Sequence, residues 1–290
     1  MSLQYYLKGI MAHNRDGSFA TQRERSSTLL LVAKQLKEAG FRQMKPESFK
    51  TKHIDCLVNR WKEEGLSVGT IKNRMSHLRW LAEKIAKPQI VLSNAALDIP
   101  NRCHVSNTDQ STTLTEEHLS KISDPHLRDA LRLQETFGLR REEALKFIPA
   151  FAMKNIDLNN AITLKASWCK GGRERTIPVR NEKQIQLLWT LSERYGGDSL
   201  IHSNKKYVEM KDLYKNAIKR CGLGKGHGLR HAYAQQRYFE LTGWQCSVKG
   251  GFKRCQLKGK DKLMDEVARM TISKELGHGR IDVVAQYLGS

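Results

Sequence analysis

The sequence predicts a mainly α-helical protein with one small antiparallel sheet, an α+β chain divided into two domains. Apolar residues recur at helical spacing from about residue 21 to about residue 87, and again in the second half of the chain. Only two short segments, over 162–166 and 175–179, have the composition of strands. A polar stretch over 94–112 separates the two halves, and 290 residues commonly form about two domains.

The first predicted domain, residues 1–105, contains three helices by its apolar pattern. The first two end near Gly40 and Gly65, and the third begins after Ser67 and ends before Pro88. The apolar stripes that we expect to be buried are Leu29, Leu30, Val32, Ala33 and Leu36 in the first helix, Phe49, Ile54, Leu57, Val58 and Trp61 in the second, and Ile71, Met75, Leu78, Ala82 and Ile85 in the third.

The second predicted domain, residues 112–290, combines further helices with the two strands. Its first helix begins after Thr115, an N-cap residue followed by two acidic residues. The glycines at 171–172 predict the turn between the strands. The predicted elements are a helix from about Pro125 to Gly138, strands over 162–166 and 175–179, and helices over 184–195, over 207–221 and from about His227.

The charge of the chain predicts a polyanionic partner. Fifty Lys and Arg against thirty Asp and Glu give a net charge of +20, which suits nucleic acid, with an inert basic surface as the alternative. The third helix carries polar and basic residues at helical spacing on its outer faces, so we expect this helix to contact DNA. The candidate contact residues there are Lys72, Asn73, Arg74, His77 and Arg79.

Membrane insertion, secretion and bound cofactors are not expected. The chain has no run of 18 apolar residues, and its first ten residues are too polar for a secretory signal, which predicts a cytoplasmic protein. Its glycines match no nucleotide-binding pattern. The six scattered cysteines are expected to be reduced. Zinc bound by Cys221, His227, Cys246 and Cys255 is the alternative, although their spacing fits no common zinc finger.

Four fragments of the second domain supply groups that can bind a phosphate or react with it. They are 138–143, 169–173, 227–231, and 275–280 together with Tyr287. A phosphodiester resists attack because its charge repels nucleophiles and its alkoxide is a poor leaving group. Arg140 and Arg230 can neutralise the non-bridging oxygens, because a guanidinium binds them bidentately and stays charged. The phenol of Tyr287 is the candidate nucleophile.

The remaining groups in these fragments can move protons. His227 and His278 can donate hydrogen bonds to the phosphate, and His227 can also accept the tyrosine proton. Lys170, near the tip of the predicted hairpin, is the candidate general acid for a departing 5′-hydroxyl. Each residue alone has a structural alternative, such as a packed histidine, an exposed lysine at a turn or a core tyrosine. Their coincidence in one basic chain favours catalysis.

The four fragments resemble the tyrosine recombinase (phage integrase) family. The matching motifs are Gly-Leu-Arg-x-x-Glu, Lys-Gly-Gly-Arg-Glu-Arg, His-x-Leu-Arg-His, and Leu-Gly-His with a tyrosine nine residues later. Residues 1–105 resemble the family's helical, SAM-like core-binding domain and residues 112–290 its catalytic domain, which implies a C-shaped clamp. The resemblance implies the catalytic residues Arg140, Lys170, His227, Arg230, His278 and the nucleophile Tyr287, with Glu143 supporting the first arginine.

The resemblance also implies a reaction and its partners. One DNA strand is cut through a 3′-phosphotyrosyl intermediate and rejoined without metal or ATP, by a homo-tetramer on double-stranded attachment sites, with accessory DNA-bending proteins as further partners. The expected role is that of an integrase of a prophage, integrative element or genomic island, in the cytoplasm and associated with the nucleoid. A type IB topoisomerase-like enzyme and a non-catalytic DNA-binding protein on the same fold remain the alternatives.

Two features depart from the family pattern. The segment 241–264 separates Arg230 from His278 by more than is usual; it is basic and predicts a flexible loop that follows phosphates, or a disordered insertion without a role. Only three residues follow Tyr287, whereas family members commonly pass a longer segment to a neighbouring protomer; a trimmed chain and association through other surfaces both stay open. The candidate DNA contacts in this domain are Arg173, Arg175, Lys253 and Arg254.

Overall fold

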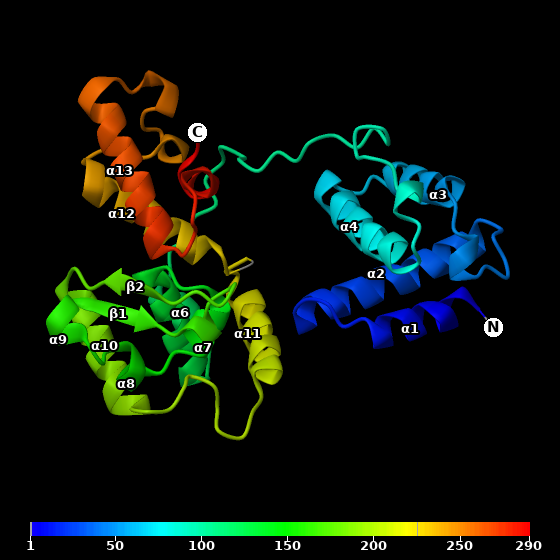
Figure 1. Ribbon diagram of the computed structural model, residues 1–290. Coiled ribbons are helices and arrows are strands. Elements are labelled where there is room, and N and C mark those ends of the chain that lie inside the picture. The colour runs from blue at the N-terminus through cyan, green and yellow to red at the C-terminus, as the bar shows by residue number, and fades with distance from the viewer. Residues whose placement is uncertain (1, 225) are drawn as a thin grey trace. The chain divides into compact units, whose positions relative to one another are not determined.

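The computed structural model describes residues 2–224 and 226–290 and divides into two compact units, Met1–Cys103 and His104–Ser290 (Figure 1). The described residues are mostly helical and contain one two-stranded antiparallel sheet, which confirms the predicted fold class. None of the described helices has the length and apolar run that a membrane crossing requires.

The first unit packs its helices around one apolar core. Trp61 is fully buried at the centre, and its Nε1 donates to the Gln35 Oε1 at 2.9 Å. The predicted stripe of the third helix is confirmed, since Met75 and Leu78 are almost completely buried. The helices are α1 (Leu3–His13), α2 (Phe19–Glu38), α3 (Thr51–Glu63) and α4 (Val68–Lys84), with the short 3₁₀ helices η1 (Pro46–Ser48) and η2 (Pro88–Ile90).

The ends of these helices follow from local side-chain chemistry. The hydroxyl of Ser67 accepts a hydrogen bond from the Thr70 amide at 3.2 Å, which satisfies one of the free donors at the start of α4.

The sequence pattern did not predict α1, because this helix buries only two side chains, Leu3 and Leu7, and so shows no long apolar stripe.

The second unit surrounds its short sheet with helices. Strands β1 and β2 pair with Ala161 opposite Pro178 and Leu164 opposite Arg175. The elements are α5 (Glu116–Ser120), α6 (Pro125–Phe137), α7 (Arg141–Leu145), α8 (Pro149–Ala152), α9 (Ile156–Asn159), β1 (Ala161–Leu164), η3 (Ala166–Trp168), β2 (Arg175–Pro178), α10 (Glu182–Tyr195), α11 (Tyr207–Cys221), α12 (Gly228–Thr242), η4 (Ser247–Lys249), η5 (Arg254–Gln256), α13 (Gly259–Glu275), η6 (Ile281–Val284) and α14 (Ala285–Leu288).

Helix α12 is the element that places the candidate site in the interior. It packs against α6, α13 and the last helix, α14, and Figure 1 shows α12 and α13 running side by side. Leu229 and Ala234 are fully buried on α12, so the intervening turn lies inside the unit as well. As a result, Arg230 is only 1% exposed.

The segment 241–264, predicted to be a flexible or disordered loop, contains more regular structure than that prediction implied. The segment contains the end of α12, the 3₁₀ helices η4 and η5 and the start of α13. A Cβ on Gly251 would lie 1.7 Å from the Gln245 carbonyl oxygen, so the chain is tightly folded there. Arg254 forms ion pairs with Asp265 at 3.5 Å and Glu266 at 3.4 Å, which join the segment to α13.

Candidate active site

Arg230 and Tyr287 form the centre of a buried polar cluster. The Arg230 Nε donates to the Tyr287 hydroxyl at 3.2 Å. The other two guanidinium nitrogens donate to the carbonyl oxygens of Gly138 and Leu276, so three separate segments hold the group in place. Burial lowers the pKa of Arg230 to about 10, which still leaves the guanidinium charged at neutral pH. The cluster thus holds a fixed positive charge beside a phenol.

Two histidines complete the surroundings of the tyrosine hydroxyl. The Nε2 atoms of His278 and His227 lie 3.2 and 3.5 Å from the Tyr287 oxygen. The His278 Nε2 is also 3.3 Å from the Arg230 Nη2. Burial, together with the charge of Arg230, lowers the pKa of His227 to about 4 and that of His278 to about 3. Both rings are therefore neutral near pH 7 and can accept a proton.

These pKa values predict that the protein loses stability as the pH falls from about 6.5 towards 4. An unfolded histidine takes up a proton near pH 6.5, whereas folded His278 does so only near 3, so the unfolded state binds more protons across this window. Thermal unfolding at several pH values measures the effect. The variant His278→Gln should show a shallower fall than the wild type, and an equal fall in both proteins would contradict the assignment.

Arg140 is held by a buried carboxylate at the start of α7. The Glu143 side chain is completely buried; its Oε1 accepts from the Arg140 Nη1 at 2.8 Å and its Oε2 from the Arg140 amide at 2.7 Å. The charge of Arg140 also contributes to the lowered pKa values of Arg230 and both histidines, which places its guanidinium towards the tyrosine cluster. Its side chain keeps 20% exposure, so it remains open to a ligand.

Arg175 makes a second, two-pronged contact with Glu143. Its Nη1 and Nη2 donate to the two carboxylate oxygens at 2.7 and 2.8 Å, and its Nε donates to the Glu275 carbonyl at 3.0 Å. Burial alone would raise the pKa of Glu143, but the ion pairs with Arg175 and Arg140 lower it to about 2. The carboxylate is therefore charged and shared by two guanidinium groups.

The expected DNA contact at Arg175 is not supported, because this side chain is only 8% exposed and already paired. Residues two apart on a strand point to the same face, so Arg175 shares the inward face of fully buried Ile177. The alternation of inward and outward residues along β2 is the signal in the sequence from which the inward direction of the Arg175 side chain could have been predicted. Arg173 is exposed, and its guanidinium lies 3.8 Å from the position that a Cβ on Gly279 would take.

A glycine at position 138 is required by both conformation and space. Gly138 has a φ of +62° at the end of α6, and a Cβ there would lie 2.5 Å from a ring carbon of Tyr233. Its carbonyl oxygen accepts from Arg230. Gly138 ends α6, leaves space for the Tyr233 ring and accepts a hydrogen bond from Arg230. It therefore connects the fold of α6 to the site.

Lys170 is not joined to the cluster by any contact that the structure shows. It is exposed in the segment between η3 and the 171–172 glycines and makes no hydrogen bond or ion pair with the described residues. Its neighbour Cys169 accepts a hydrogen bond from the Arg175 Nη1 at 3.4 Å, so the segment is attached beside the site. The predicted catalytic residues thus divide into a formed cluster and one free cation.

The candidate DNA contacts on α4 differ in accessibility. His77 is only 7% exposed, and burial lowers its pKa, so the structure does not support a DNA contact there. Arg74 lies 5.1 Å from the Trp61 ring, and burial lowers its pKa too. The other three candidates are partly or fully exposed, and each has a hydrogen-bond partner: Asn101 for Lys72, Arg102 for Asn73 and Asn94 for Arg79.

The candidates in the inserted segment are likewise unequal. The Arg254 side chain is occupied by Asp265 and Glu266, whereas the side chain of Lys253 forms no ion pair within the described part of the chain. The alternative zinc site is not formed, since no three His, Cys, Asp or Glu side chains gather among the described residues in a way that could hold a metal. Cys56, Cys169, Cys221, Cys246 and Cys255 form no disulfide bond.

Sequence reasoning missed three residues around the site. His231 is buried, and its ring centre lies 4.7 Å from that of Tyr287. Glu275 is 4% exposed and accepts from the Tyr233 hydroxyl at 2.8 Å and the Arg237 Nε at 3.0 Å. His231 and Glu275 belong to the quoted fragments, but their types alone did not distinguish them from packing residues. Arg237 lies outside every fragment.

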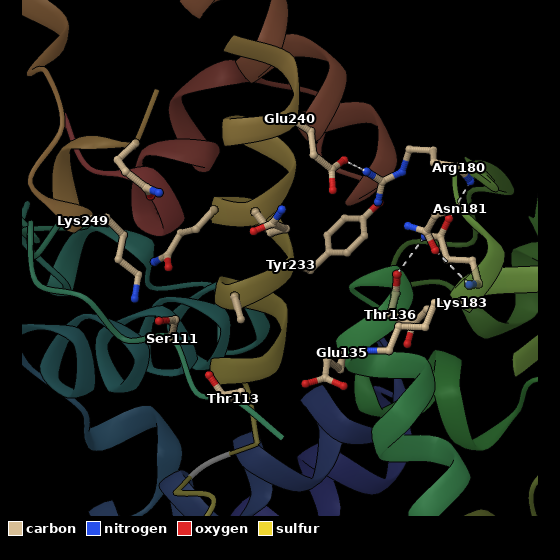
Figure 2. Close-up of a pocket in the computed structure, with 15 residues that line it drawn as sticks. Ser111, Thr113, Glu135, Thr136, Arg180, Asn181, Lys183, Tyr233, Glu240 and Lys249 are labelled. Carbon is tan, nitrogen blue, oxygen red and sulfur yellow. Dashed lines mark hydrogen bonds and ion pairs between the residues drawn. The ribbon is translucent and has the colours of Figure 1, made fainter. Parts of the chain in front are cut away.

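A separate polar pocket of about 700 Å³ is lined in part by residues of α12, among them Tyr233 and Glu240 (Figure 2). Arg180 and Glu240 form an ion pair across its edge, and the Arg180 guanidinium lies 5.4 Å from the ring centre of Tyr233. Glu135 also lines the pocket, and burial raises its pKa. Arg230, Tyr287, His227 and His278 do not line this pocket, so it is distinct from the candidate site.

Two protein-family models match most of the chain. The family model described as "Phage integrase, N-terminal" matches residues 1–91, and the one described as "Integrase" matches residues 101–236. Together they cover most of the chain but end before His278 and Tyr287. No curated protein sequence matches.

Solved integrase structures share the fold. The Tn1549 transposon integrase in complex with circular intermediate DNA has a TM-score of 0.55 and 16% identity, covering 100% of this chain and 96% of that one. A lambda integrase dimer bound to a COC′ core site has a TM-score of 0.60 and 18% identity, covering 99% and 77%. The fold and the two family models define a member of the integrase class of proteins. The chain belongs to the tyrosine recombinase (phage integrase) family.

Proposed function

We propose that this protein is a site-specific DNA recombinase in which Tyr287 is the nucleophile. The observation that carries the proposal is the position of the Tyr287 hydroxyl, within 3.2 to 3.5 Å of nitrogen atoms of Arg230, His278 and His227. A core tyrosine needs one partner for its hydroxyl, whereas this one has three, all capable of binding a phosphate oxygen or a proton. The arrangement suits transfer of a phosphoryl group to the phenol.

In the proposed reaction, Arg140 and Arg230 neutralise the two non-bridging oxygens of one phosphodiester. The Tyr287 oxygen forms a bond to phosphorus while the bond from phosphorus to the 5′-oxygen breaks. His227, whose ring is neutral near pH 7, accepts the phenolic proton, and Lys170 gives a proton to the leaving oxygen. The products are a 3′-phosphotyrosyl bond and a free 5′-hydroxyl.

The second half of the reaction reverses the first with a new strand. A 5′-hydroxyl from a partner duplex attacks the phosphotyrosine, its proton passes to Lys170, and the Tyr287 oxygen leaves with the proton from His227. Each phosphodiester that is broken is replaced by another, so no external energy source is needed. Tyrosine is suited to this exchange because a phenolate leaves more readily than an alkoxide.

We also propose double-stranded DNA attachment sites as the substrate, with residues 1–105 as core-binding domain, residues 112–290 as catalytic domain and four protomers on two sites. The net charge of +20 and the DNA-bound integrases of the same fold support DNA as partner. We propose an integrase role in a prophage, integrative element or genomic island, and membership of the family supports it. The remaining candidate contacts are Lys72, Asn73, Arg79, Arg173 and Lys253.

The test is to find the residue that carries the DNA. The protein is incubated with overlapping duplexes that cover the DNA flanking its coding region. Each duplex carries a nick close to the cut, so that the short fragment with the free 5′-hydroxyl diffuses away. We expect a denaturant-resistant adduct, and mass spectrometry of its proteolytic peptides should find a nucleotide on Tyr287. An adduct on another residue would overturn the proposal. Relaxation of supercoiled plasmids without any sequence preference in cleavage would instead favour a type IB topoisomerase.

A further inference from the structure

We infer that Gln235 is a positioning residue for the nucleophile, acting through the backbone of Tyr287. The inference rests on the proposed function, since it takes Tyr287 to be the reacting group. Gln235 lies on α12, is 4% exposed and makes no contact with the phenolic oxygen. Its amide nitrogen instead joins two acceptors, the Asp109 Oδ1 at 2.9 Å and the Tyr287 carbonyl oxygen at 3.2 Å.

The orientation of this amide follows from its partners. Both neighbouring atoms are oxygens that only accept hydrogen bonds, so the nitrogen with its two N–H groups must face them. A flipped amide would place its own oxygen against a carboxylate and a carbonyl. The Gln235 carbonyl oxygen has no partner among the described residues, so the side chain is held by the two bonds that its nitrogen donates.

The bond to Tyr287 satisfies a group that its own helix leaves free. Helix α14 has only four residues, 285–288, and the last carbonyls of a helix have no partner within it. Gln235 supplies that partner from α12. Neighbouring carbonyls are held separately, because the Ser247 hydroxyl donates to Leu288 at 3.0 Å and the Arg269 Nη1 donates to Gly289 at 2.9 Å. Gln235 is thus the side chain that fixes the peptide of the nucleophile itself.

Asp109 is held firmly on the other side of Gln235. Its Oδ2 pairs with the Lys249 Nζ at 2.7 Å, and its Oδ1 accepts from the Ser111 amide at 2.9 Å. Figure 2 shows Ser111 and Lys249 beside α12. Burial alone would raise the pKa of Asp109, but Lys249, Ser111 and Gln235 lower it well below its usual range. A permanent charge therefore orients the amide.

The connection joins the nucleophile to the chain segment with which the second unit begins. Asp109 and Ser111 lie in this segment, and Asn107 accepts from the Ser290 amide at 2.9 Å. Displacement of the segment would release both Gln235 and the residues after Tyr287. In-line attack needs the phenolic oxygen within a few tenths of an ångström of its position, because small misplacements reduce reaction rates steeply. The position of the phenol thus depends on the position of the segment that contains Asn107, Asp109 and Ser111.

The experiment measures the first-order rate of adduct formation by the full-length protein at saturating concentration on the nicked duplex. Gln235→Leu keeps the size of the side chain but removes both donors, and we expect about a tenfold slower rate with unchanged DNA affinity. Gln236→Leu, one residue along the same helix and exposed, is the matched control and should react like the wild type. Thermal unfolding of each variant shows whether the fold is retained.

A double-mutant cycle separates positioning from general packing. If Asp109 acts through Gln235, Asp109→Ala should also slow cleavage, and Gln235→Leu with Asp109→Ala should be no slower than the slower single variant. If the two substitutions acted independently, the factors by which they slow adduct formation would multiply in the double variant. Should Gln235→Leu fail to fold, Asp109→Ala alone decides, since a wild-type rate in that variant overturns the inference.

The inference and the proposed function fail in different ways. Wild-type cleavage by both Gln235→Leu and Asp109→Ala, with an adduct that still maps to Tyr287, would overturn only the positioning role. An adduct that forms elsewhere than on Tyr287 would overturn the proposed nucleophile, whatever the Gln235 variants do.

Discussion

Tyr287→Phe is expected to reduce covalent adduct formation by at least about 10⁴-fold while DNA affinity stays unchanged. Removal of the attacking atom leaves no other route to the intermediate, and losses of this order are usual for covalent catalysts. The phenyl ring keeps its packing against His231, so the fold should survive. Adduct formation on nicked duplexes, resolved under denaturing conditions, gives the rate, and a gel-shift titration gives the affinity.

The control for this variant is a buried tyrosine whose hydroxyl has no hydrogen bond to Arg230, His227 or His278. Tyr214 is 1% exposed, and its hydroxyl donates to the Gln134 Oε1 at 2.9 Å. Tyr214→Phe removes one hydrogen bond worth about 1 kcal/mol and should cleave at the wild-type rate. A normal adduct yield from Tyr287→Phe would exclude Tyr287 as the nucleophile, whereas a parallel loss in Tyr214→Phe would indicate a general folding defect.

Much of the fold and the cluster could be predicted because the information is local. Helices α2, α3 and α4 of the first unit follow from apolar spacing, and the strands at Ala161–Leu164 and Arg175–Pro178 lie within the predicted segments or one residue beside them. Arg230 and Tyr287 were selected for their chemistry, and the structure brings them into contact although they are 57 residues apart. Residue type alone was not sufficient, because Tyr214 and Tyr238 are also buried tyrosines; the coincidence of the four fragments selected Arg230 and Tyr287.

The rest depended on contacts that no local pattern encodes. Gln235 and Asp109 are 126 residues apart, and a glutamine on a helix has no type-specific role that would distinguish it from its neighbour Gln236. Arg175 was predicted to contact DNA from its positive charge alone. That prediction did not take into account that Arg175 lies on the buried face of β2. The burial of His77 depends in the same way on the packing around α4.

Glu143→Gln is expected to produce the second large effect, on stability as well as on cleavage. The variant keeps the shape of the side chain but removes the charge that faces two guanidinium groups, one of them, Arg175, only 8% exposed. Breaking one partner of a buried ion pair typically costs about 3 to 5 kcal/mol, which in a unit of this size lowers the thermal midpoint by about 10 °C. Differential scanning calorimetry measures this shift.

The adjacent glutamate provides the matched control. Glu142 pairs with Lys146 at 2.6 Å, but its side chain is 47% exposed, and exposed ion pairs contribute little to stability. Glu142→Gln should therefore unfold close to the wild-type temperature. If the two variants unfolded alike, the buried carboxylate would not be the group that holds the two arginines.

Cleavage by Glu143→Gln should fall even where the protein remains folded. The Glu143 carboxylate fixes both the backbone and the guanidinium of Arg140, so its neutralisation frees the one arginine of the site that stays partly exposed to a ligand. Loss of a preorganised donor to a developing charge commonly costs about 10²- to 10³-fold in rate. Measured well below the unfolding temperature, a rate within a few-fold of the wild type would show that Arg140 does not depend on Glu143 for its position.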